Sequence, residues 1–195
     1  MLDSIALDST RLQRLQQIPL WDFALALYAK PGVEAACLTL QEEAEIDVCE
    51  LLFHCWLCSS GLEAIPAVLA DEREQRRLWQ CQVTEVLRGL RRDLKAQAGA
   101  SEPVAALRET IKQAELMAER ENLQRWQAWV CEASDMQQRV RNITENAPNT
   151  AIWLRKQLFM PLSHAQLKSD SIAPSKLFQA LQTLTSQLDP HLVAR

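Results

Sequence analysis

Four basic residues share one face of a helix that is predicted near the middle of the chain. They stand at positions i, i+3, i+4 and i+7, which are neighbours on a helical surface, and they are Arg88, Arg91, Arg92 and Lys95. Such a face could bind an acidic protein, an anionic headgroup or the phosphates of a nucleic acid. The alternative is a solvated face whose charges pair with carboxylates of a neighbouring helix.

Two carboxylates further along the chain, Glu115 and Glu119, lie one helical turn apart and also share a face. Such a pair could ligate a metal ion or divide the roles of general acid and base. A di-iron helical site would also need Glu-x-x-His motifs, and the sequence contains none. We therefore predict ion pairs with Arg91 or Arg92 of a facing helix, with no catalytic residue, no metal and no cofactor.

A Cys-x-x-Cys pair, Cys55 and Cys58, follows His54 in an apolar segment. Structural zinc needs four ligands, usually from two paired clusters, and a second cluster is missing here. A redox pair usually lies at the start of a helix, where the thiol pKa is lowered, whereas this pair lies late in one. We predict packed, reduced thiols.

The basic residues and the carboxylates fall on two long amphipathic helices. Apolar residues recur at helical spacing over residues 71–96 and again over residues 104–132. Two long helices joined by a short turn form an antiparallel hairpin. Small residues at Ala114 and Ala118, in the apolar spine of the second helix, would let the two backbones approach closely.

Shorter apolar segments before and after the hairpin predict further helices. The most apolar one covers residues 51–58, and Asp47 is placed to be its N-cap, with Glu50 reaching back. The other predicted helices cover about residues 20–30, 31–45, 136–146, 151–160 and 175–188. We divide the chain into an N-terminal docking or frayed segment (1–19), a helical bundle domain (20–160) and a loosely attached C-terminal helix and tail (161–195).

Composition excludes several functional classes. The four glycines are too far apart to build a phosphate-binding loop. A net charge of −4 argues against nucleic-acid binding. No apolar run is long enough to cross a bilayer, and the first residues lack the basic region of a secretory signal. We expect a cytoplasmic protein without a nucleic-acid partner or a membrane span.

Several short motifs occur together in the first third of the chain, namely Trp21-Asp22-Phe23, Tyr28-Ala-Lys-Pro-Gly-Val33, Leu38-x-Leu40-Gln41 and Asp47-Val48. Together with the later Arg91-Arg92 and Glu115 regions, they resemble a family of short proteobacterial helical proteins that is catalogued as a domain of unknown function. The resemblance covers about residues 20–125 and implies a cytoplasmic bacterial helical protein with no assigned activity. It departs at Cys49, where the family pattern implies Asn.

We predict an all-α helical bundle built on a long antiparallel hairpin, with a short apolar N-terminal helical layer. The predicted binding residues are Trp21, Asp22, Asp47, Arg88, Arg91, Arg92, Lys95, Glu115 and Glu119.

The function that we favour is non-enzymatic protein interaction or regulation. The protein partner would bind through the basic face or an aromatic region that contains Trp126, Trp129 and Trp153. The hairpin could also pair with its own copy as a homodimer. Two alternatives stay open. One is a small-molecule or lipid binder with an apolar pocket near Trp21 and Trp56, and the other is a metal-assisted enzyme that uses the helix carboxylates.

Overall fold

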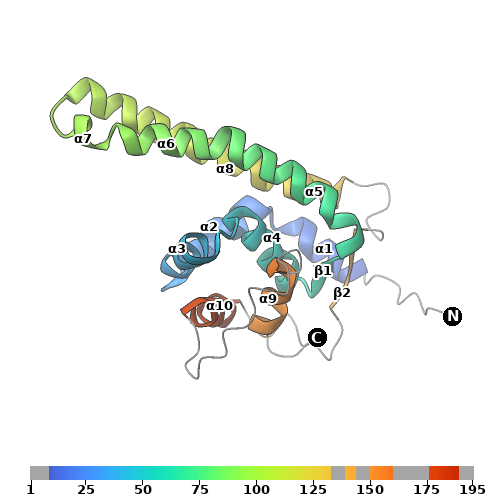
Figure 1. Ribbon diagram of the computed structural model, residues 1–195. Coiled ribbons are helices and arrows are strands. Elements are labelled where there is room, and N and C mark those ends of the chain that lie inside the picture. The colour runs from blue at the N-terminus through green and yellow to red at the C-terminus, as the bar shows by residue number, and fades with distance from the viewer. Residues whose placement is uncertain (1–8, 133–138, 144–149, 160–175, 189–195) are drawn as a thin grey trace.

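The computed structural model describes residues 9–132, 139–143, 150–159 and 176–188. Within these residues the chain is almost entirely helical, which confirms the predicted all-α class. A long hairpin lies across a body of shorter helices, and its far end extends beyond that body (Figure 1).

Helix α4 (Val48–Ser59) forms the centre of the body. Nearly all of its side chains are buried, as expected for a helix that is apolar all round. It packs against α2 (Leu20–Tyr28), α3 (Val33–Ala44), α9 (Thr150–Phe159) and the second half of α8. The buried apolar side chains of the described residues therefore form one hydrophobic core, with α4 inside it.

The first and last described helices contribute to the same core. In α1 (Ser9–Gln17), Leu15 is buried and the Arg11 side chain donates a hydrogen bond to the Gly61 carbonyl at 2.7 Å. Helix α10 (Lys176–Gln187) packs on α3 and buries Leu184. The boundaries 1–19, 20–160 and 161–195 stay predictions, and parts of the first and last segments lie outside the described residues.

The start of α4 confirms the predicted cap. The Asp47 carboxylate accepts hydrogen bonds from the backbone N–H groups of Cys49 at 2.7 Å and Glu50 at 3.4 Å. These two donors have no partner inside the helix, so the cap satisfies them. The Glu50 carboxylate does not reach back as predicted, because it accepts a hydrogen bond from the Arg73 side chain at 2.6 Å instead.

A small antiparallel sheet corrects the helix predicted over 136–146. Strand β2 (Val140–Asn142) pairs with β1 (Leu62–Ala64), with Glu63 opposite Arg141. The Glu63 carboxylate is buried and binds Arg141 at 2.7 Å, and it also accepts from Trp153 at 2.7 Å. These long-range partners explain why local helical spacing gave the wrong prediction, since strand pairing depends on residues about 80 positions away.

The hairpin begins with α5 (Pro66–Trp79), continues through a π-helical turn η1 (Gln80–Thr84) into α6 (Glu85–Asp93) and the short α7 (Lys95–Ala98), and returns as α8 (Glu102–Cys131). In η1 the N–H of Glu85 bonds the carbonyl of Gln80, five residues back. One extra residue in the turn rotates the following helix by about 100°.

Among the described residues, no single helix is long and apolar enough to cross a membrane, although α2 and α3, bent by 102° relative to each other, would meet the length and composition test together.

Candidate functional site

A buried ion cluster joins α6 to α8 at the point where the hairpin leaves the body. The guanidinium of Arg88 contacts three carboxylates: Glu115 at 2.8 Å, Glu119 at 2.8 Å and Glu85 at 2.6 Å. Arg91 pairs with Glu115 at 2.5 Å. Arg88 is only 9% exposed, and Glu115 is buried too. The cluster therefore fixes the register of α6 on α8 through Arg88 and Glu115, whose charges are largely removed from water.

The carboxylates form ion pairs with arginines of the facing helix, as predicted. Their partners are Arg91 and Arg88, however, and not Arg92. Burial favours the neutral acid, but hydrogen bonds from Arg91 and Arg88 hold the pKa of Glu115 below its usual value. For Glu119, burial raises the pKa against the attraction of Arg88. Both carboxylates face arginines, so the arrangement that the metal-assisted alternative requires is occupied by ion pairs.

The end of α4 that carries Asp47 lies against this cluster. The thiol of Cys49 is 3.9 Å from the Glu119 carbonyl oxygen, and the charge of Arg88 acts on Asp47. Burial raises the pKa of Asp47 from 3.8 to about 6, the charge of Glu50 adds to the rise, and two backbone N–H groups oppose it. The structure thus brings Asp47, Arg88, Arg91, Glu115 and Glu119 into one region.

Replacing Asp47 by Asn is expected to raise the free energy of unfolding at pH 7 by about 1–3 kcal/mol. Folding raises the pKa of Asp47, so the folded state binds its proton more tightly. The stabilisation of the folded state that this proton provides is fully present below pH 3.8 and is lost as the pH rises through about 6. Asn keeps the N-cap and stays neutral throughout.

Urea unfolding of both proteins between about pH 4 and pH 7 measures this effect. The difference between them should be small at the acid end and grow toward neutrality. Asp22→Asn, which removes an exposed carboxyl, is the control. A difference that stays constant with pH, or a wild-type protein that is the more stable one at pH 7, contradicts the prediction.

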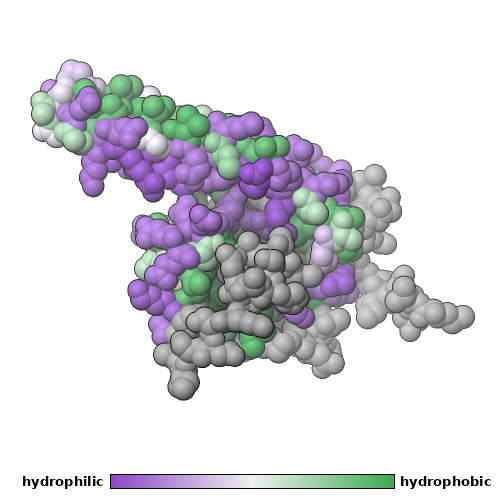
Figure 2. Space-filling model, viewed as in Figure 1, coloured by the Kyte–Doolittle hydropathy of each residue, from purple (hydrophilic) through white to green (hydrophobic). Residues whose placement is uncertain are grey.

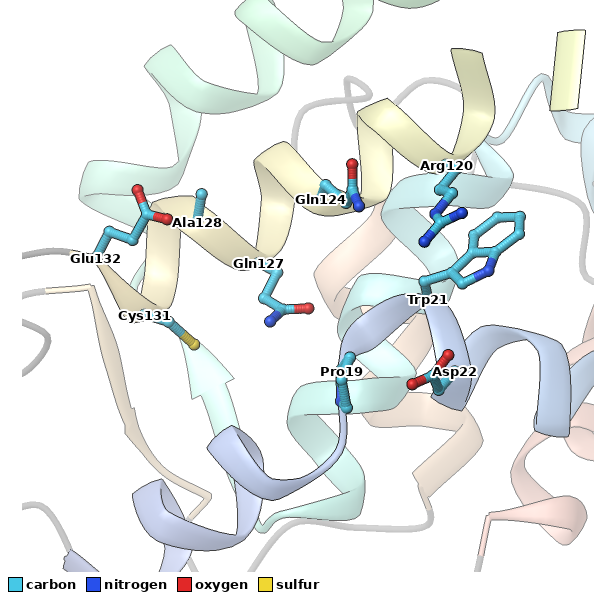
Figure 3. Close-up of a pocket in the computed structure, with 9 residues that line it drawn as sticks. All are labelled: Pro19, Trp21, Asp22, Arg120, Gln124, Gln127, Ala128, Cys131 and Glu132. Carbon is cyan, nitrogen blue, oxygen red and sulfur yellow. The ribbon is translucent and has the colours of Figure 1, made fainter. Parts of the chain in front are cut away.

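Trp21 and Asp22 lie elsewhere, in an open groove between the start of α2 and α8 (Figure 3). The groove has a volume of about 420 Å³, and α8 lines it with Arg120, Gln124 and Gln127 among others, while Glu132 lines it from just beyond the end of that helix. The Arg120 guanidinium lies over the Trp21 ring, 5.6 Å from its centre. This groove is open and largely polar, whereas the small-molecule alternative predicted a closed apolar pocket near Trp21 and Trp56.

The remaining basic residues do not form one continuous exposed face. Arg88 is buried, and so is Arg76, which pairs with Glu72 at 2.8 Å. Arg92 and Lys95 are exposed near the tip of the hairpin. The solvated-face alternative therefore describes only Arg92 and Lys95, whereas Arg88 helps to hold the hairpin together.

The cysteine motif and the aromatic residues belong to the core. Cys55 and Cys58 are buried free thiols, and burial raises their pKa values, that of Cys58 to about 12. Trp126 is fully buried and stacks on Phe53 with ring centres 4.5 Å apart. Within the residues that the structure describes, no group of three or more His, Cys, Asp or Glu side chains is placed to hold a metal ion.

The structure reveals an apolar surface along the hairpin. We call it the hairpin strip, and its members are Val83, Val86, Leu87, Leu90, Leu94, Leu107, Ala114 and Met117. Leu90 is 49% exposed and Met117 is 71% exposed. Figure 2 shows hydrophobic residues along much of the side of the hairpin that faces away from the body, and hydrophilic residues along the side that faces it. The ion cluster and the strip thus lie on opposite sides of the same two helices.

Comparison with protein families identifies the chain. A family model described as a protein of unknown function (DUF2390) matches residues 19–126, which is more than half of the chain, so the chain belongs to this family. The matched segment runs from α2 to the second half of α8 and contains both the ion cluster and the hairpin strip. Comparisons with curated proteins and with solved structures gave no match.

Proposed function

We propose that this protein is a non-enzymatic protein-interaction module and that the hairpin strip is its binding surface. The observation that carries the proposal is the orientation of α6. This helix is strongly amphipathic, yet Arg88 and Arg91 of its charged face are turned toward α8, and Val86 and Leu90 are turned to solvent. A helix normally buries its apolar face, so an exposed one on a projecting hairpin favours a protein partner.

The rigidity of the hairpin supports the same function. Arg88 and Arg91 fix α6 on α8, Trp79 donates a hydrogen bond to the Ala118 carbonyl at 3.0 Å, and Arg108 donates to the Arg91 carbonyl at 3.1 Å. These contacts hold the strip in one shape before a partner arrives. A preformed surface loses less conformational entropy on binding than a mobile one. We place this interaction in the bacterial cytoplasm, which is the setting that the family resemblance implies.

Site-specific photo-crosslinking in living cells tests the proposal. A photoreactive phenylalanine analogue replaces Leu90 in the strip, and in a matched variant it replaces Leu116, which is 45% exposed on the opposite side of α8. We expect light-dependent adducts heavier than the monomer from position 90 and none from position 116. Circular dichroism verifies that both variants are folded. Equal yields at the two positions, or no adduct at position 90, would refute the strip as a binding surface.

A further inference from the structure

The hairpin strip carries no charge of its own. None of its eight members is ionisable. At its base, Glu121 and Arg125 are paired with each other at 2.6 Å, and the Arg125 guanidinium lies 3.9 Å from the centre of the Trp79 ring. Two identical strips can therefore meet without bringing like charges together, which is the usual obstacle to the pairing of identical surfaces. A strongly basic or acidic partner would find no complementary charge in the strip.

Each hairpin helix also has two faces suited to packing on other helices. On α8 one face lies against α6 and includes Ile111, Glu115 and Ala118. Beside it runs a second face at intervals of three and four residues, with Leu107, Thr110, Ala114 and Met117. The first hairpin helix has the matching set Val83, Leu87, Leu90 and Leu94. Helices in an antiparallel four-helix bundle pack on two neighbours each, so these helices have the pattern of a bundle of which one hairpin supplies half.

We infer that the hairpin strip binds a second copy of this chain, so that two hairpins pack face to face around a two-fold axis as a four-helix bundle. This inference rests on the proposed function and names its partner. The body lies on the other side of the hairpin (Figure 2), so the second copy approaches a free face. Two hairpins supply four helices, which completes the bundle without a third component.

The size of the strip sets the expected strength of the dimer. From Val83 to Leu94 the helix advances about 17 Å at 1.5 Å per residue, and two packed helices are about 20 Å wide. This is a small interface, so we expect a dissociation constant in the micromolar range rather than a permanent dimer.

Sedimentation velocity of the full chain between about 1 and about 200 µM tests the inference. The mass should rise with concentration from the monomer value of 22.2 kDa toward twice that value. Leu90→Glu places two carboxylates in the symmetric interface and should weaken the dimer at least about 100-fold. Leu116→Glu, on the opposite side of α8, should dimerise like the wild type. Because both leucines are about half exposed, both variants should fold.

The other outcomes separate this inference from the proposed function. A wild-type chain that stays at the monomer mass throughout overturns the dimer. Equal effects of Leu90→Glu and Leu116→Glu also overturn it, because the contact would then lie on another surface. If the chain is monomeric while crosslinking at position 90 yields an adduct with a different polypeptide, the inference of a dimer is wrong and the proposed function stands. If position 90 yields no adduct either, the proposed function fails as well.

Discussion

Replacing Arg88 by Met is expected to lower the free energy of unfolding by about 2–3 kcal/mol. Methionine fills a similar volume but leaves the three carboxylates of the ion cluster without their shared partner. Glu115 keeps Arg91, and Glu119 can take up a proton, because burial already raises its pKa. These two responses hold the cost below that of an isolated buried charge. Urea unfolding at pH 7 measures the difference.

Arg92→Met is the matched control, because Arg92 is exposed on the same helix and its replacement should change the free energy of unfolding by less than about 0.5 kcal/mol. The cost of Arg88→Met should also shrink as the pH falls, because burial raises the pKa of Glu119 and this carboxylate takes up a proton in the variant. If Arg88→Met and Arg92→Met unfold at the same urea concentration as the wild type, the cluster does not stabilise the hairpin.

Local sequence patterns were sufficient for most of the helices. The apolar run of α4, its Asp47 cap and the two long hairpin helices depend on residues within a few turns of each other. The π-helical turn at Gln80–Thr84 was not predicted, because it leaves the apolar spacing of 71–96 nearly unchanged in the sequence. It nevertheless decides which face of α6 meets α8. The buried Thr84, with no hydrogen-bond partner for its hydroxyl among the described residues, marks this turn only in the structure.

The candidate site shows the same division between local and long-range information. The sequence predicted that arginines and Glu115 would pair, because charges on facing helices attract each other. It could not show that Arg88 is buried, or that Trp21 and Asp22 lie in a groove apart from the ion cluster. For the hairpin strip, the available signal was that the apolar face of the first helix is wider than one partner helix can cover. Val86 and Leu90 on one helix and Leu107 on the other exceed what a single seam buries.

Replacing Trp126 by Ala is expected to cost about 4 kcal/mol, the largest effect of any single change considered for this chain. Trp126 is fully buried where α8 meets α4, stacks on Phe53 at 4.5 Å and contacts Trp129 edge-on at 6.2 Å. Truncation leaves a cavity that two helices fixed by many other contacts cannot close. Domains of this size are stable by about 5–15 kcal/mol in total, so this cost is a large part of the stability. For a chain of this length it should lower the melting temperature by roughly 8–16 °C.

The Phe variant at the same position separates packing from hydrogen bonding. The indole N–H of Trp126 has no hydrogen-bond partner among the described residues, so Trp126→Phe loses ring volume but no hydrogen bond and should cost less than about 2 kcal/mol. Calorimetric melting of both variants measures the two costs. If Trp126→Phe costs as much stability as Trp126→Ala, the loss of the indole N–H accounts for the cost, and this group must have a hydrogen-bond partner. If Trp126→Ala costs less than about 1 kcal/mol, the second half of α8 does not pack into the core against α4, and the hairpin is not anchored to the body in this way.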